Sequence, residues 1–119
     1  MPRSPLAYLN DIVVCCDAIA ETLDGVDLPA YASTRTLRSA VEREFTIIGE
    51  AVNSLSKIDP DLISRISHAR MIVGFRNQLV HDYPAILDSA VWAIAQKDAP
   101  ILRAECAALI KELVDRSGR

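Results

Sequence analysis

The chain has 119 residues and a formal net charge of −3, and half of its residues are hydrophobic although only 5% are aromatic. This length suits one domain with a single core, and the aliphatic composition favours packed helices over a β-sandwich. The acidic balance argues against a general nucleic-acid coat protein. No apolar run approaches the roughly 20 residues that span a bilayer, and the N-terminal M-P-R-S-P lacks a signal-peptide core. We therefore expect one cytoplasmic domain over residues 1–119, with a polar tail from about 115 and no membrane contact.

In the first half of the chain, hydrophobic residues recur every three or four positions, as they do in amphipathic helices. A Ser-Pro pair at residues 4–5 predicts the start of a first helix, which Gly25 ends. Residues 26–32 are predicted to be a linker, and residues 33–57 a long second helix. Gly49 lies inside this helix at a cost of nearly 1 kcal/mol relative to alanine. We infer that another backbone approaches the long helix closely at this glycine.

The second half continues the helical pattern. Asp-Pro at 59–60 predicts a short helix, whose run continues into a central helix ending near residues 81–83, because Pro84 disfavours helical conformation in the residue before it. Another helix is predicted over residues 86–95, and Asp98 is predicted to cap the last one. No stretch alternates with the period of a strand. The predicted fold is an all-α antiparallel bundle of four main helices plus one or two short ones.

The stretch 69–84 holds polar residues inside an otherwise apolar helical run. At about 100° per residue, one stripe is apolar and is predicted to face the core: Met71, Ile72, Phe75 and Leu79. A polar stripe lies roughly opposite, with spacings of four, three and four: Arg70, Gly74, Asn77 and His81. Arg76 falls between the two stripes. Packing and solubility do not explain these polar residues, so this stretch is the candidate site.

Positive charge is concentrated beside the polar stripe. Residues 62–81 contain Arg65, Arg70 and Arg76 and no Asp or Glu, which gives a local charge of +3. Because the whole chain carries −3, the rest of it carries −6. Chance over a short window, or an ordinary solvated face, remains the simple alternative.

The three cysteines, Cys15, Cys16 and Cys106, form no C-x-x-C pair and are odd in number. A disulfide framework or a zinc site is therefore not expected. We interpret them as small buried hydrophobic residues and predict neither a metal nor a cofactor.

The central stretch resembles a known family. R-N-Q-L-V-H-D-Y at 76–83 is similar to the R-x-x-x-x-H-x-Y signature of the HepT-like branch of the HEPN superfamily. A-V-E-R-E-F-T-I-I-G-E-A-V at 40–52 resembles the long second helix of that family, and G-F-R-N at 74–77 and V-W-A-I at 91–94 also match. The chain departs from many relatives at residues 68–69, where it has His-Ala in place of Pro-Trp.

The resemblance implies a HEPN-like helical-bundle toxin with metal-independent endoribonuclease activity, belonging to a type II or type VII-like toxin–antitoxin pair. Its partner would be a minimal nucleotidyltransferase antitoxin. Arg76 and His81 match the family's catalytic pair, Asn77 the polar residue after the arginine, and Tyr83 the tyrosine to which the antitoxin transfers AMP. The family also implies a homodimer in which two motifs face a shared cleft.

The chemistry agrees with these assignments. Cleaving RNA without a metal requires a base for the 2′-OH proton, which histidine suits, and a clamp for phosphate, which arginine suits. Asn77 and Arg70 are expected to support phosphate binding. Arg76 and His81 lie about 140° apart around a regular helix, so they converge through the long arginine side chain, a loosened helix end or two subunits. Gly74 would let a second helix approach closely.

Other interpretations remain open. His81 would also suit a helix C-terminus, where a cation favours the macrodipole, and Arg76 would form an ordinary ion pair with Glu44 or Glu50. Tyr83 would serve as a half-buried anchor, and His68, outside the motif, is interpreted as structural or exposed. A further set, read as a solvated face or an extended RNA-binding surface, is Arg35, Arg38 and Arg43. The alternative function is a non-catalytic subunit that binds nucleotide or acts as a scaffold for a nucleotidyltransferase.

Overall fold

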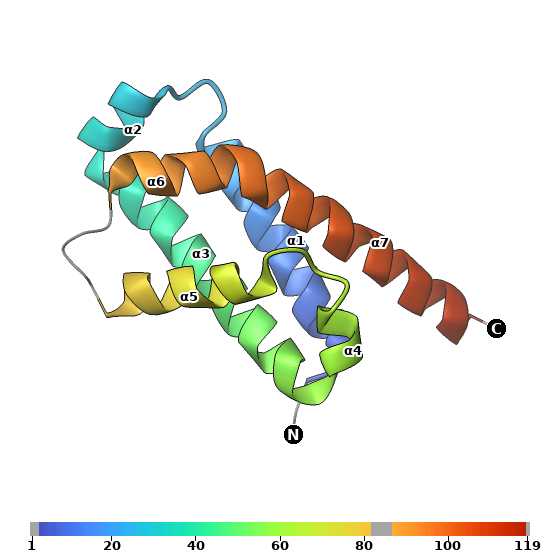
Figure 1. Cartoon of the computed structure of the whole chain (residues 1–119). Coiled ribbons are helices and arrows are strands. Elements are labelled where there is room, and N and C mark those ends of the chain that lie inside the picture. Colours follow the sequence, from blue (N-terminus) through green and yellow to red (C-terminus); the bar gives the residue numbers. More distant parts are fainter. Residues whose placement is uncertain (1–2, 82–86, 119) are drawn as a thin grey trace.

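The computed structural model describes residues 3–81 and 87–118, which fold into helices joined by short connections (Figure 1). In chain order the elements are α1 (Pro5–Thr22), α2 (Leu28–Ser33), α3 (Arg35–Ile58), α4 (Pro60–Ile63), α5 (Ala69–Val80), α6 (Asp88–Ala93), the π-helical segment η1 (Ile94–Asp98) and α7 (Ala99–Ser117). The described residues contain no strand. The predicted all-α bundle is confirmed, with α2 and α4 as its short helices.

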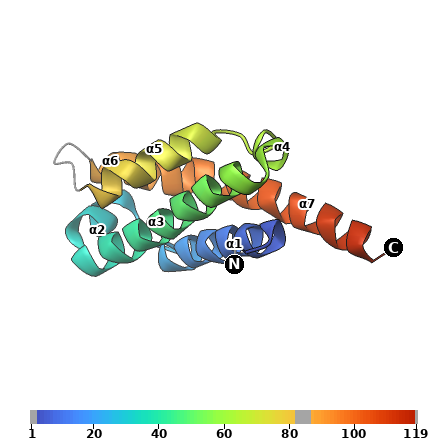
Figure 2. The ribbon, with the colours of Figure 1, turned by 90° about the horizontal axis from the view of Figure 1, so that it is seen from below.

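The long helices pack in layers. α3 lies between α1 and α5, as two perpendicular views show (Figures 1 and 2), and α7 packs against α1. The C-terminal part of α7 extends past the rest of the bundle in both views. Of the helices in the described ranges, none has the length and apolarity needed to cross a membrane.

The core is aliphatic and uncharged. α1 and α3 bury side chains at helical spacing, including Leu9, Ile12, Val41, Ile48 and Leu55, each of them fully inaccessible. No polar or charged residue is buried among the described part of the chain. Burying each such Val, Leu or Ile contributes about 1.5–3 kcal/mol, so this periodic set holds the bundle together.

The cysteines behave as small hydrophobic residues, as predicted. Cys15, Cys16 and Cys106 are all buried and free. Burial raises the pKa of each thiol from 9.0 to about 12, because the low-dielectric core disfavours the thiolate. They contribute packing and are poor nucleophiles at neutral pH.

The linker predicted over residues 26–32 is wrong, because most of it is the helix α2. The Asp27 side chain accepts a hydrogen bond from the Ala30 N–H at 2.9 Å, and Pro29 lies in the first turn. Tyr31 is completely buried, with its ring centroid 5.8 Å from that of Trp92. Six residues are too few to show a helical period in the sequence, and the buried Tyr31 anchors this short helix to the bundle.

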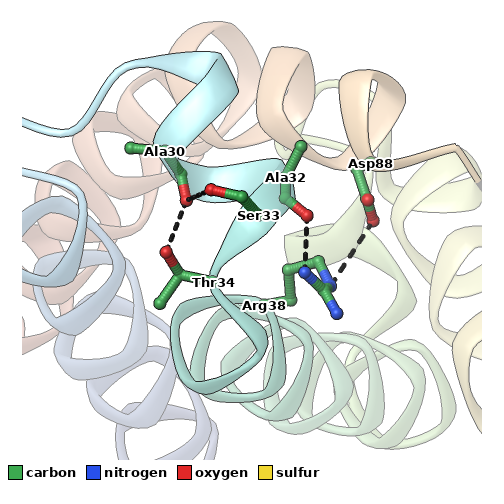
Figure 3. Close-up of polar contacts among 6 residues, drawn as sticks. All are labelled: Ala30, Ala32, Ser33, Thr34, Arg38 and Asp88. Atoms are coloured by element: carbon green, nitrogen blue, oxygen red, sulfur yellow. Dashed lines mark hydrogen bonds and ion pairs between the residues drawn. The ribbon is translucent and has the colours of Figure 1, made fainter.

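Arg38 is only partly the solvated residue that the sequence predicted. Its guanidinium donates to the Ala32 carbonyl oxygen at 2.5 Å and lies 4.0 Å from the Asp88 carboxylate (Figure 3). Thr34 donates to the Ala30 carbonyl oxygen at 2.7 Å beside it. Arg38 therefore joins the end of α2 to α6, whereas Arg35 and Arg43 are exposed.

Two predicted boundaries were also wrong. Asp98 does not cap a separate last helix: its backbone is helical, its side chain makes no capping bond, and α6 continues through η1 into α7. The wide π turn removes the clash between Pro100 and the preceding turn. The chain also breaks before α5, because His68 has a positive φ of 62° and Ser67 binds Glu105 through its N–H at 3.1 Å and its hydroxyl at 2.7 Å.

Candidate functional site

α5 rests on α3 through a narrow apolar contact. Ile72 and Phe75 are buried, and the Phe75 ring meets the Phe45 ring edge to face, with centroids 5.2 Å apart. Leu79 is half-buried, whereas Met71, predicted to face the core, is exposed. Met71 lies at the edge of the apolar stripe, next to the exposed Arg70, and this edge of α5 faces solvent. The apolar contact is narrower than predicted.

The predicted polar stripe faces away from the core. Arg70, Gly74, Asn77 and His81 are all exposed. A Cβ atom on Gly74 would meet no atom within 4 Å, so this side of α5 is open in the single chain. The helical spacing therefore predicted correctly which residues share this surface.

Gly49 is where α3 and α5 approach each other. A Cβ atom at Gly49 would overlap the Cβ of Arg76, lie 2.5 Å from its Cγ and lie 3.4 Å from the Ile72 carbonyl oxygen. The first carbons of the Arg76 side chain thus fill the space that any side chain at position 49 would need. The close approach predicted from this glycine is confirmed, and its partner is the candidate arginine.

The Arg76 guanidinium is held at the surface by two acceptors. One terminal nitrogen donates to Asn77 Oδ1 at 2.9 Å, and the other donates to Glu50 Oε1 at 3.2 Å. The Arg76 side chain is 27% exposed, while that of Glu50 is 53% exposed. Nε of Arg76 is buried and has no hydrogen-bond partner among residues 3–81 and 87–118. The stem is therefore fixed by packing, while part of the fork stays accessible to solvent.

The ion pair that the sequence analysis considered for Arg76, with Glu44 or Glu50, is confirmed, and Glu50 is the partner. It directly follows Gly49 on α3, so the glycine that admits Arg76 also brings this carboxylate within reach of the guanidinium. At a partly exposed site such a pair contributes only about 0–1 kcal/mol to stability. Breaking this pair therefore costs little stability.

The other arginines of the 62–81 window differ in their contacts. Arg65 pairs with Glu112 of α7 at 2.7 Å. Arg70 is exposed and has no ion-pair partner among the residues that the structure describes. The predicted concentration of positive charge therefore reduces to Arg70 and the partly neutralised Arg76.

His81 lies where α5 ends. It is the C-cap residue, its N–H donates to the Asn77 carbonyl oxygen at 3.1 Å, and its side chain is exposed. The predicted end of the helix near residue 81 is confirmed, and so is the C-terminal position considered for His81. Tyr83, the predicted site of AMP transfer, lies outside the described residues. Arg76 and Asn77 are thus brought together, and His81 follows one turn beyond Asn77.

Comparison with known proteins decides the family. The model of the family described as "Ribonuclease HepT-like" matches residues 12–109, which include both α3 and the α5 motif. The chain belongs to this family. The resemblance and the ribonuclease class predicted from the sequence are both confirmed at this level.

Relatives align with the HepT-like chain along nearly its whole length. A protein of Methanocaldococcus jannaschii, which bears the name "Putative RNase", is 29% identical over 98% of this chain and 100% of its own length. A second protein with that name, from Caldanaerobacter subterraneus subsp. tengcongensis, is 27% identical over 96% of this chain and 97% of its own. No solved structure matches the chain significantly.

The candidate site combines an arginine, an amide, a histidine and a carboxylate: Arg76, Asn77, His81 and Glu50. Within residues 3–81 and 87–118, no group of three or more His, Cys, Asp or Glu side chains is placed to hold a metal ion. The residues present supply hydrogen-bond donors for phosphate oxygens in Arg76 and Asn77, and a proton acceptor in His81. This set is suited to phosphodiester chemistry by acid–base and electrostatic means.

Proposed function

We propose that the chain is a metal-independent endoribonuclease and the toxin of a toxin–antitoxin pair. The observation that carries the proposal is the placement of Arg76, whose stem is locked over Gly49 while its guanidinium reaches the surface beside Asn77. A guanidinium needed only for a surface ion pair does not require a glycine on the facing helix. Locking the stem preorganises the fork of donors, which is what a phosphate clamp needs.

In this mechanism His81 removes the proton from the 2′-OH of the RNA, and the 2′ oxygen attacks the adjacent phosphorus. A bond forms between phosphorus and the 2′ oxygen, the bond to the 5′ oxygen breaks, and water supplies the proton that the leaving oxygen takes. Arg76 leaves Glu50 to hold the phosphate oxygens, whose charge grows in the transition state. Asn77 orients the guanidinium through its Oδ1, and Arg70 holds the backbone nearby.

A homodimer completes the site in this proposal. Arg76 is half-buried against α3, whereas His81 is exposed at the end of α5, so each lies on a different side of the helix. Pairing two copies through the open face at Gly74 places the His81 of each copy toward the cleft that both motifs line. The shared cleft also excludes water from the phosphate clamp, which strengthens its electrostatic contribution.

The catalytic proposal is tested by cleavage of defined single-stranded RNAs in the presence of a chelator. His81→Ala should lower the rate by about 10²-fold or more, because general-base catalysis contributes 10²–10⁴-fold. The matched control is His68→Ala, which removes an exposed histidine that lies outside the motif. Full activity of His81→Ala, or strict dependence on an added metal, would overturn the mechanism.

We also propose that a nucleotidyltransferase antitoxin neutralises the toxin by transferring AMP to Tyr83. Tyr83 lies two residues beyond His81, just after α5 ends, and a phosphodiester attached there would bring negative charge to the clamp and repel RNA. Intact mass after co-expression should show one or more added AMP groups, and Tyr83→Phe should show none while remaining toxic. An unchanged mass in a fully neutralised complex would instead assign neutralisation to occlusion of the cleft.

The second candidate is a non-catalytic subunit that binds nucleotide or acts as a scaffold for a nucleotidyltransferase. The observation that favours it is that the Arg76 guanidinium engages both Glu50 and Asn77 within the chain, as an ordinary structural arginine does. The two functions differ in one simple outcome: expression of this chain alone arrests growth if it is a toxin, and has no effect if it is a scaffold.

A further inference from the structure

A hollow of about 340 Å³ opens between α3, α4 and the first turns of α5. Its apolar lining includes Val52, Ile63 and Val73, and its polar lining is Asn53, Ser56 and Arg70. We call it the α3–α5 pocket. Its volume is at the lower end of the roughly 300–1,000 Å³ typical of small-molecule sites, which suits a single flat ring system.

The polar groups of the α3–α5 pocket are not used up by the fold. Ser56 donates its hydroxyl hydrogen to the Asn53 carbonyl oxygen at 2.6 Å, so that hydroxyl is occupied. The side-chain amide of half-buried Asn53 and the guanidinium of Arg70 have no hydrogen-bond partner among the described residues. One amide, with a donor and an acceptor side by side, therefore remains at an otherwise apolar hollow, with a cation at its edge.

The pocket adjoins the phosphate clamp. Asn53 follows Gly49 by four residues on α3, about 6 Å along the axis, and Arg70 precedes Arg76 by six residues on α5, about 9 Å at 1.5 Å per residue. Both helices therefore run from the Gly49–Arg76 crossing directly to the pocket, in the direction of α4. Arg70 also belongs to the exposed stripe that ends at His81.

We propose that the α3–α5 pocket binds the base of a nucleotide that flanks the scissile phosphate of a single-stranded RNA. The base packs against the aliphatic lining, the Asn53 amide pairs with the donor and acceptor on its edge, and Arg70 holds its phosphate. Single-stranded RNA is recognised by unstacked bases inserted in this way, and one good bidentate contact discriminates between bases by about 5- to 150-fold. The inference rests on the proposed ribonuclease function and names a residue that sets its sequence preference.

The first experiment measures binding without cleavage. Full-length protein is titrated with short single-stranded 2′-O-methyl homopolymers of each base, which cannot be cut because the nucleophile is blocked. The wild type should prefer one base, and Asn53→Ala should reduce that preference by about 5- to 150-fold, the range of one bidentate contact. Asn10→Ala, which removes an exposed asparagine on α1, should leave it unchanged.

A second variant fills the pocket instead of removing its polar group. Ala69 lines the hollow, and Ala69→Leu keeps a good helix former in the first turn of α5. It should abolish the base preference while circular dichroism stays that of the wild type. Equal affinity of the wild type for all the homopolymers, or an unchanged preference in both Asn53→Ala and Ala69→Leu, would overturn the proposal.

The two proposals fail in different ways. Base-specific binding that depends on Asn53, without cleavage of unmodified RNA, would leave the pocket standing and remove the ribonuclease function. Cleavage of a random-sequence RNA with identical mapped ends in wild type and Asn53→Ala would leave the ribonuclease function standing and remove the base-binding pocket.

Discussion

α1 and α5 both pack against α3, but they do so by different means. α1 contributes uncharged side chains at regular spacing, such as Leu9, Ile12 and Ile19, which are almost completely inaccessible. α5 buries Ile72 and Phe75 and then sets the stem of an arginine over a glycine. The first contact is what hydrophobic burial alone produces. The second replaces part of the apolar contact by the packed stem of one charged side chain, whose guanidinium reaches the surface.

The largest expected effect lies in the α1–α3 core. Leu55 is fully buried, so Leu55→Ala should lower the free energy of unfolding by about 2–5 kcal/mol through lost transfer energy and a residual cavity. Urea denaturation followed by circular dichroism measures it. Leu6→Ala, at a leucine that is 38% exposed, should cost much less. Equal costs at both positions would show that the core is not where the structure places it.

The next largest effect on stability is expected at Gly49, and Gly74 should behave in the opposite way. Gly49→Ala should destabilise the fold by about 1–3 kcal/mol, because the new methyl group overlaps the Arg76 side chain and forces α5 to move. RNA cleavage should fall with it, since the clamp moves too. Gly74→Ala, with nothing within 4 Å of the new carbon, should instead stabilise α5 by up to about 1 kcal/mol. If both substitutions lower the free energy of unfolding, or both raise it, α3 and α5 do not meet at Gly49 as the structure places them.

The smallest effect on stability is expected at the open face of α5. Gly74→Leu should raise the unfolding free energy of the monomer by no more than about 1 kcal/mol, as Gly74→Ala does, yet weaken the proposed dimer and reduce cleavage in parallel. Sedimentation velocity over a concentration series measures the association. A wild-type protein that stays monomeric at every practical concentration and still cuts RNA would contradict the shared cleft.

The difference between the α1–α3 contact and the α5–α3 contact also explains which features the sequence predicted and which it did not. Long helices with a repeated apolar stripe were located to within a few residues, because periodicity reports directly on burial. Three features depend on tertiary contacts that no local pattern encodes: α2 forms around the buried Tyr31, η1 absorbs Pro100, and the break at His68 is held by Glu105. Each of these was missed.

At the candidate site, local spacing was more informative. The exposed stripe of Arg70, Gly74, Asn77 and His81 is as predicted, and Gly49 marked a close approach before its partner was known. The sequence offered both Glu44 and Glu50 as partners of Arg76, and the crossing of α3 and α5 selects Glu50. The α3–α5 pocket needs three helices in place. Residues from separate helices meet only in the folded chain.

One comparison of cleavage rates tests whether Arg76 is a phosphate clamp and not simply an ion-pair residue. Arg76 pairs with Glu50 at 3.2 Å, and Arg103 pairs with Asp17 at 2.8 Å, so each arginine variant breaks one surface ion pair. Arg76→Ala should lower the cleavage rate by about 10²-fold or more. It should also cost more stability than the roughly 0–1 kcal/mol of a surface ion pair, because the stem packed over Gly49 is lost as well. Arg103→Ala should cost at most about 1 kcal/mol and keep wild-type cleavage. Equal cleavage rates in the two variants would contradict the account.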